Sequence, residues 1–162
     1  MSSARRILFA ARRIVFAVVC LLWAGACIGI SFAEAEKFRA PSLSRSVAFD
    51  VGRTVFHTWQ VVQAAPAVLA ILAAIASRVS RWAQGCLVLV WVALLLQNAV
   101  LLPMLEARAQ TIIAGGVPAG ASPHAFYAAL EVLKVLALIV AAVLSLQPPR
   151  PIVRPEKRGR PS

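Results

Sequence analysis

Four long apolar blocks constrain this chain more than any other feature of its sequence. They cover residues 14–32, 54–76, 84–105 and 124–146. Each block is close to the ~20 residues that an α-helix needs to cross a ~30 Å hydrocarbon core. Only 14% of the 162 residues are charged, whereas ordinary globular domains carry about 25%. The sequence therefore predicts an all-α, four-helix transmembrane bundle in a multi-pass membrane protein.

The two ends of the chain differ from the apolar blocks. Residues 1–13 form a basic N-terminus, and residues 147–162 form a basic, proline-rich tail. The tail has too few apolar residues to fold, so it should be disordered. The first block could be a cleaved secretory signal, because Ala33-Glu34-Ala35 fits a cleavage site. Its apolar stretch is longer than the ~7–15 residues of a typical signal, which favours an uncleaved first span.

The distribution of basic residues predicts the orientation of the protein. The formal net charge is +11, but the basic residues flank the apolar blocks and form no basic face interleaved with aromatic residues, so no nucleic-acid partner is expected. The two ends and the 77–82 connection carry more Lys and Arg than the 33–53 and 106–123 connections. The positive-inside rule then places both termini in the cytoplasm, beneath a plasma membrane whose anionic lipids the basic termini would contact.

The two connections on the outer side have different expected structures. In the first, Leu43, Val47, Val51 and Val55 recur every four residues, which predicts a short helix lying at the membrane interface. Gly52 would then allow a bend before the second span. The second connection, residues 106–123, follows Pro103 and is rich in glycine and proline, which is typical of an irregular loop.

Polar residues recur at one depth inside three of the blocks. Gln60 and Gln63, Gln97 and Asn98, and Glu131 each lie about six to nine residues from the outer edge, or roughly 9–13 Å deep at 1.5 Å per residue. Three helices thus offer polar side chains at the same level. We predict that these side chains meet in the outer half of the bundle, where they could bind or pass a small solute.

Charged residues extend this predicted cluster. A charged residue inside a span costs ~2.5–3.5 kcal/mol, so its presence needs a reason. Glu131 and Lys134 are three residues apart and share a helix face, where they partly neutralise each other. The predicted cluster is centred on Glu131 and comprises Glu131, Lys134, Gln60, Gln63, Gln97, Asn98, Arg53 and His57.

Other interpretations of these residues remain open. Polar residues in membrane helices can act only as contacts between helices, worth about 0.6 kcal/mol each. The chain would then be a structural or interaction subunit, and Gly25-x-x-x-Gly29 would let another helix approach within a homo-oligomer or beside another membrane protein. His57 and His124 near the outer boundary could also bind haem or copper.

No ligand spacing repeats around either histidine, so we expect no cofactor and no metal site. The sequence also shows no nucleophile–base arrangement and no phosphate-binding glycine loop. Enzymatic activity is therefore not expected.

Short motifs follow one another through the chain: Trp23-x-Gly25, Lys37-Phe38-x-Ala40-Pro41, Gly52-Arg53-x-x-Phe56, Leu102-Pro103 and Pro123-His124-Ala125-Phe126-Tyr127. In this order they resemble small bacterial four-span membrane proteins and, more distantly, the transmembrane protein 205 family. The resemblance covers most of residues 23–145. It implies a four-helix integral membrane protein, and it implies no reaction and no catalytic residue.

Overall fold

The computed structural model describes residues 3–147 as a set of consecutive helices. In chain order they are α1 (Ser3–Glu36), the 3-10 turn η1 (Lys37–Arg39), α2 (Arg45–Ser77), α3 (Arg81–Leu96), the π-helical turn η2 (Gln97–Leu101), α4 (Leu102–Ile113) and α5 (His124–Leu146). No strand occurs between residues 3 and 147, and the predicted all-α fold is confirmed. The tail predicted to be disordered lies outside the described residues from position 148 onward.

The helices form four membrane-length segments, because α3, η2 and α4 continue one another. These segments are Ser3–Arg39, Arg45–Ser77, Arg81–Ile113 and His124–Leu146, each long and apolar enough to cross a membrane. This is the architecture of a multi-pass membrane protein. The 33 residues of α2 span about 50 Å at 1.5 Å per residue. Because the hydrocarbon core is only ~30 Å thick, the ends of α2 extend beyond it.

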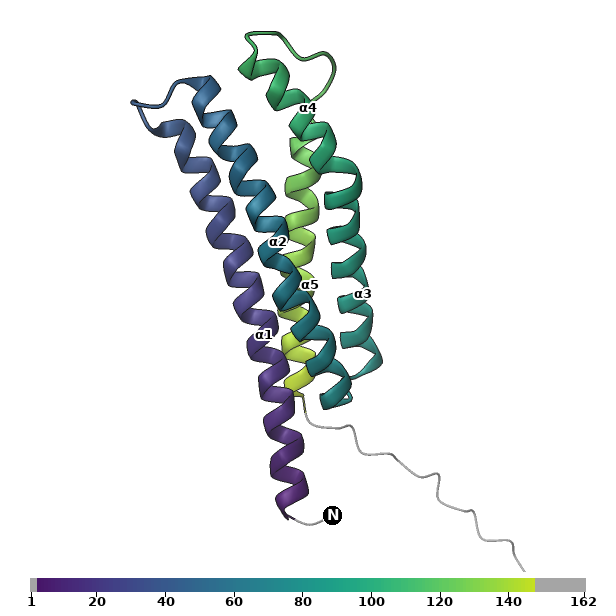
Figure 1. Cartoon of the computed structure of the whole chain (residues 1–162). Coiled ribbons are helices and arrows are strands. Elements are labelled where there is room, and N and C mark those ends of the chain that lie inside the picture. The colour runs from purple at the N-terminus through teal and green to yellow at the C-terminus, as the bar shows by residue number, and fades with distance from the viewer. Residues whose placement is uncertain (1–2, 148–162) are drawn as a thin grey trace, which may run out of the picture.

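The helices run roughly side by side, and α5 lies between α1 and α3 (Figure 1). We call the end that holds residues 3 and 147 the proximal end, and the end that holds the 40–44 and 114–123 connections the distal end. The α2 helix packs on α1 and, toward the distal end, on α4. At the proximal end the Ser77 hydroxyl donates to the Arg12 carbonyl at 2.8 Å, which ties α2 to α1.

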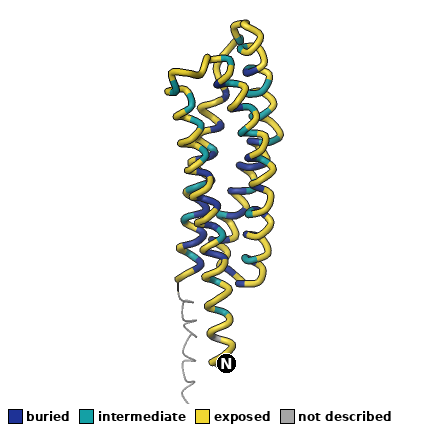
Figure 2. Tube along the Cα trace, turned by 60° about the vertical axis from the view of Figure 1, so that its left-hand side comes forward, coloured by how far each residue is buried: buried dark blue, intermediate teal, exposed yellow. Residues whose placement is uncertain are grey.

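The core is built from large side chains on α1 and small residues on its neighbours. Phe16, Cys20, Trp23 and Cys27 are spaced four, three and four residues apart and are at most 1% exposed. The buried positions of α2 and α5 in this core are mainly alanines: Ala67, Ala70, Ala74, Ala137, Ala141 and Ala142. Small residues let helix backbones approach closely. Figure 2 shows the buried residues along the inner faces and exposed residues along the outer faces.

The distal connection between α1 and α2 is shorter than the sequence predicted. The α2 helix begins at Arg45, where the Ser44 hydroxyl caps it by accepting from the Val47 N–H at 3.4 Å. The predicted separate interfacial helix and the predicted bend at Gly52 are therefore wrong. Residues 45–53 are the first turns of α2, because an uninterrupted helix keeps their backbone groups hydrogen-bonded whereas a break would leave several of them unpaired.

The prediction that the third span ends at residue 105 and gives way to an irregular loop is also wrong, because the helix continues past Pro103 to Ile113. Proline lacks the N–H that a helix interior needs, and here the π-helical turn Gln97–Leu101 ends two residues before Pro103. A π turn shifts the hydrogen-bond register by one residue, so the helix resumes with Pro103 in the first turn of α4. Of the loop predicted over residues 106–123, only residues 114–123 are irregular, and Gly115 and Gly120 adopt positive φ angles of 80° and 71° there.

Candidate functional site

Lys134 of α5 is the hub of a buried polar network that joins three helical elements. Its side chain is fully buried. The ammonium Nζ donates to Gln63 Oε1 of α2 at 2.6 Å and to Gln97 Oε1 of η2 at 2.9 Å, and it pairs with Glu131 Oε2 at 2.9 Å. An ammonium has three N–H donors, and these three contacts use all of them. The network thus satisfies a charge that lies ten residues into α5, or about 15 Å from its distal end.

Only one of the two carboxylate oxygens of Glu131 belongs to this network. Its Oε2 atom accepts from Lys134 and also from Gln97 Nε2 at 2.8 Å. Gln97 Nε2 additionally donates to the Tyr127 carbonyl at 3.2 Å, so the π-helical turn is fastened to α5. Asn98, although next to Gln97, donates to the Leu94 carbonyl of its own helix at 2.9 Å and takes no part in the network.

Gln60 joins the network indirectly. Its Oε1 accepts from Gln63 Nε2 at 3.4 Å, and its Nε2 donates to the Tyr127 hydroxyl at 3.0 Å. The α2 and α5 helices are therefore linked at two levels, through Gln63 to Lys134 and through Gln60 to Tyr127.

Arg53 and His57 belong to a separate group of charges nearer the distal end. His57 Nε2 lies 2.6 Å from Glu106 Oε2, and Arg53 lies 3.5 Å from Glu106 and 2.9 Å from Asp50. The two contacts to Glu106 join α2 to α4, the contact to Asp50 lies within α2, and all three are partly exposed. The predicted cluster is thus divided into two: a buried set around Lys134 and an exposed set around Glu106.

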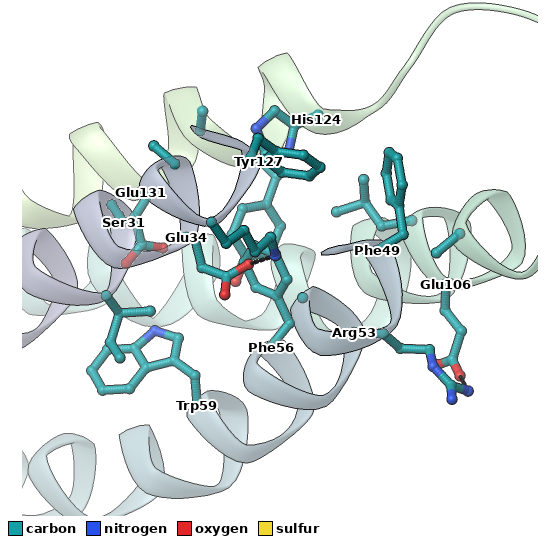
Figure 3. A pocket seen from close by; sticks show the side chains of 18 residues that line it. Ser31, Glu34, Phe49, Arg53, Phe56, Trp59, Glu106, His124, Tyr127 and Glu131 are labelled. Atoms are coloured by element: carbon teal, nitrogen blue, oxygen red, sulfur yellow. Dashed lines mark hydrogen bonds and ion pairs between the residues drawn. The ribbon is translucent and has the colours of Figure 1, made fainter. Parts of the chain in front are cut away.

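A cavity of about 280 Å³ lies between the two sets, bordered by α1, η1, α2, α4 and α5. Figure 3 shows Glu131 toward one end of it and Arg53 with Glu106 toward the other. Its walls carry five aromatic side chains: Phe38, Phe49, Phe56, Trp59 and Tyr127. Two pairs of them meet edge to face, Phe56 with Tyr127 at 5.2 Å and Phe38 with Phe49 at 5.4 Å between ring centroids. Such pairs hold a wall of rings in fixed orientations.

An internal ion pair lines the α1 side of this cavity. Lys37 of η1 pairs with Glu34 of α1, and its Nζ lies 5.2 Å and 5.9 Å from the ring centroids of Phe38 and Phe56. A side chain at Gly52 of α2 would overlap the Lys37 ammonium. The absence of a side chain at Gly52 therefore makes room for Lys37, and this close approach is its role in place of the predicted bend.

The aromatic walls of the cavity were not predicted from the sequence. Phe49, Phe56 and Trp59 are spaced seven and three residues apart, which puts them on one helix face, and this was the available signal. No comparable signal marked Glu34 or Lys37, because opposite charges three residues apart are common on exposed helices.

The structure also places the two histidines of the haem or copper hypothesis and the two glycines of the interaction-subunit hypothesis. His124 lines the cavity while His57 contacts Glu106, and no group of three His, Cys, Asp or Glu between residues 3 and 147 could hold a metal ion. Gly25 and Gly29 were expected to let a helix approach, but a Cβ at either position would meet no other described atom within 4 Å.

One acceptor in the site is unused. Glu131 is 7% exposed and lines the cavity, and its Oε1 atom is buried without a hydrogen-bond partner among the described residues. The Cys27 side chain lies near Glu131, but a thiol is only a weak donor. A buried polar atom without a partner costs about 1–3 kcal/mol, and more when it is charged. Glu131 thus presents a strong, unused acceptor beside an aromatic cavity.

No protein-family model, curated protein or solved structure matches this chain. The resemblance to the transmembrane protein 205 family therefore stays a prediction.

Proposed function

We propose that this membrane protein binds a small solute in the distal cavity, with Glu131 accepting a hydrogen bond from it. The observation that carries the proposal is the unused Oε1 atom of Glu131 beside a cavity of about 280 Å³. Most buried polar atoms in proteins have a hydrogen-bond partner, so an unpaired carboxylate oxygen at the wall of a cavity is a position where a ligand can supply one. The volume is close to the lower end of the ~300–1,000 Å³ range of small-molecule sites.

Binding is better supported than passage through a single chain. Beneath the cavity, Lys134, Gln63 and Gln97 are fully buried and bonded to one another. The proximal half then continues as a packed core around Trp23 and Leu138. The solute would therefore have to enter and leave through the distal half.

The proposed location is the plasma membrane, with both termini in the cytoplasm and the cavity facing the outer side. The excess of Lys and Arg at the two ends and in the 77–82 connection supports this orientation. The cavity would then take its solute from outside the cell or from the outer leaflet.

The test is to fill the cavity without touching the polar network. Ala128 lines the cavity on α5, whereas its neighbour Ala129 does not. The proteins Ala128→Phe and Ala129→Phe would be purified from the same cells beside the wild type, and their extracted small molecules compared by mass spectrometry. We expect a species that accompanies the wild type and Ala129→Phe but not Ala128→Phe. Identical extracts from all three proteins would refute the proposal.

A second candidate function is that of an interaction subunit. It is favoured by the open space at Gly25 and Gly29, which no described part of the chain fills. Small residues at this spacing allow a second helix to pack closely. Replacing both glycines with leucine should abolish cysteine cross-links between neighbouring copies if this face joins two chains, and it should leave the cavity unchanged.

A further inference from the structure

We infer that the ligand of the distal cavity is an uncharged, ring-sized apolar molecule with one O–H or N–H group, which donates to Glu131 Oε1. The inference rests on the proposed function and narrows it to a class of ligand. Three features of the cavity determine that class: the unused acceptor, the balance of charge, and the shape and chemistry of the walls.

The need for a donor follows from the bonding of Glu131. An ionised carboxylate can only accept hydrogen bonds. Its Oε2 atom already accepts from Lys134 and Gln97, whereas Oε1 has no partner within residues 3–147. A ligand that carries only acceptors would leave Oε1 unpaired, and it would bring a second unpaired acceptor into the same space. A ligand with a single O–H or N–H group would supply the hydrogen bond that Oε1 lacks.

The absence of a net charge on the ligand follows from the ion pairs around the cavity. Each acidic side chain that lines it already has a basic partner: Glu131 has Lys134, Glu34 has Lys37 and Glu106 has Arg53. A cationic ligand at Glu131 would meet the nearby Lys134 ammonium, and an anionic ligand would meet the Glu131 carboxylate itself. A charge without its own partner is strongly disfavoured in a buried site. The aromatic faces of Phe38 and Phe56, which could attract a cation, already lie beside Lys37.

The size and flatness of the ligand follow from the walls. Phe56 and Tyr127 meet edge to face, and Trp59 lies beside them on the wall nearest Glu131 (Figure 3). Rings pack against such a wall in stacked or edge-to-face contacts. A volume of about 280 Å³ is large enough for a molecule of one or two fused rings.

A matched series of naphthalenes tests this inference. The probes share one fused ring system and differ in one substituent: 2-naphthol donates a hydrogen bond, 2-methoxynaphthalene only accepts, naphthalene does neither, 2-naphthylmethylammonium is a cation and 2-naphthoate is an anion. Binding is measured by equilibrium dialysis against protein in lipid nanodiscs. The cavity-filled variant Ala128→Phe gives the amount of each probe that enters lipid alone, and Ala129→Phe is its matched control.

For the wild type we expect 2-naphthol to bind at least about tenfold more tightly than 2-methoxynaphthalene or naphthalene, which is the ratio for a hydrogen bond to a charged group. The variant Glu131→Gln/Lys134→Met keeps the site neutral. In this variant Gln97 still donates to the side-chain oxygen at position 131, so the amide NH₂ faces the cavity as a donor. The preference should then reverse, with 2-methoxynaphthalene bound at least as tightly as 2-naphthol.

The outcomes separate the two proposals. Tighter binding of the cation or the anion than of 2-naphthol, with Ala128→Phe abolishing it, would overturn the ligand class and leave the cavity as the binding site. Equal binding of the five probes, again abolished by Ala128→Phe, would overturn the hydrogen bond to Glu131 in the same way. Binding of every probe that is the same in the wild type and in Ala128→Phe would overturn the cavity itself and the proposed function with it.

Discussion

Replacing Lys134 with methionine would break the buried network at its hub. Methionine has a similar length and fills the same space without the charge. The Glu131 carboxylate would then keep only Gln97 Nε2 as a partner. The side-chain oxygens of Gln63 and Gln97 would both lose the ammonium that donates to them. One substitution thus leaves a buried charge without its counter-ion and two amides with a missing bond.

The expected cost follows from the burial of this pair. Breaking a buried ion pair by removing one partner costs about 3–5 kcal/mol. The unpaired amide oxygens of Gln63 and Gln97 also lower the stability, but because these groups are in contact their costs do not add in full to that of the ion pair. A protein of this size loses about 2–4 °C of melting temperature per kcal/mol, so Lys134→Met should melt roughly 6–20 °C below the wild type. The double variant Glu131→Gln/Lys134→Met removes both charges and should recover at least half of this loss.

The melting temperature can be measured through the reaction of the buried cysteines with a dye. Cys20 and Cys27 are fully buried, while Cys86 is partly exposed. In a Cys86→Ser background, a dye that fluoresces on reaction with thiols reports unfolding as the two remaining cysteines become accessible. Leu136→Met, at a lipid-facing position of α5 that is 55% exposed, is the control and should melt within about 2–4 °C of the wild type.

Two results would refute the reasoning. A melting temperature for Lys134→Met as high as that of Leu136→Met would mean that the ammonium is not needed to offset the Glu131 charge. A double variant no more stable than Lys134→Met would mean that the uncompensated carboxylate is not the cause of the loss.

Three other predictions concern the distal end. Glu106→Gln should lower the stability in the same assay far less than Lys134→Met does, because the ion pairs of Glu106 are partly exposed and screened by water; a loss as large as that of Lys134→Met would contradict this. Gly52→Ala should stabilise the Lys37→Ala variant by about 1 kcal/mol through helix propensity. The same change should give less in the wild type, where the new Cβ displaces the Lys37 ammonium, and equal gains in both backgrounds would be evidence against that contact. In a cysteine-free protein, a cysteine at Val117, which is 93% exposed, should react with an impermeant maleimide in intact cells, whereas one at Ser3 should react only after lysis. The reverse pattern would overturn the proposed orientation.

Part of the site could be predicted from the sequence because helices that cross a membrane share a common scale of depth. Each residue advances a helix by about 1.5 Å, so equal distances from the membrane edge predict equal levels. This is why counting along the spans selected Gln63, Gln97 and Glu131, which the structure places in one network with Lys134.

Depth does not determine which way a side chain points around its helix. Gln97 and Asn98 are adjacent and equally deep, yet only Gln97 faces Lys134 while Asn98 bonds to its own helix. Arg53 and His57 share a helix face with Gln60, but they meet Glu106 of α4. Rotation about the helix axis depends on packing against neighbouring helices, which a single span does not encode.

By itself, the sequence determined that the chain forms four apolar helices and that polar groups gather at one level, because span length and burial cost are properties of each segment alone. Only the tertiary structure decided that α2 is unbroken at Gly52 and that the third helix continues past Pro103, since these depend on a neighbouring lysine and on a π-helical turn. It also decided that an aromatic cavity lies beside Glu131. The cavity is made where α1, η1, α2, α4 and α5 fail to fill the space between them, and that space is a property of their arrangement.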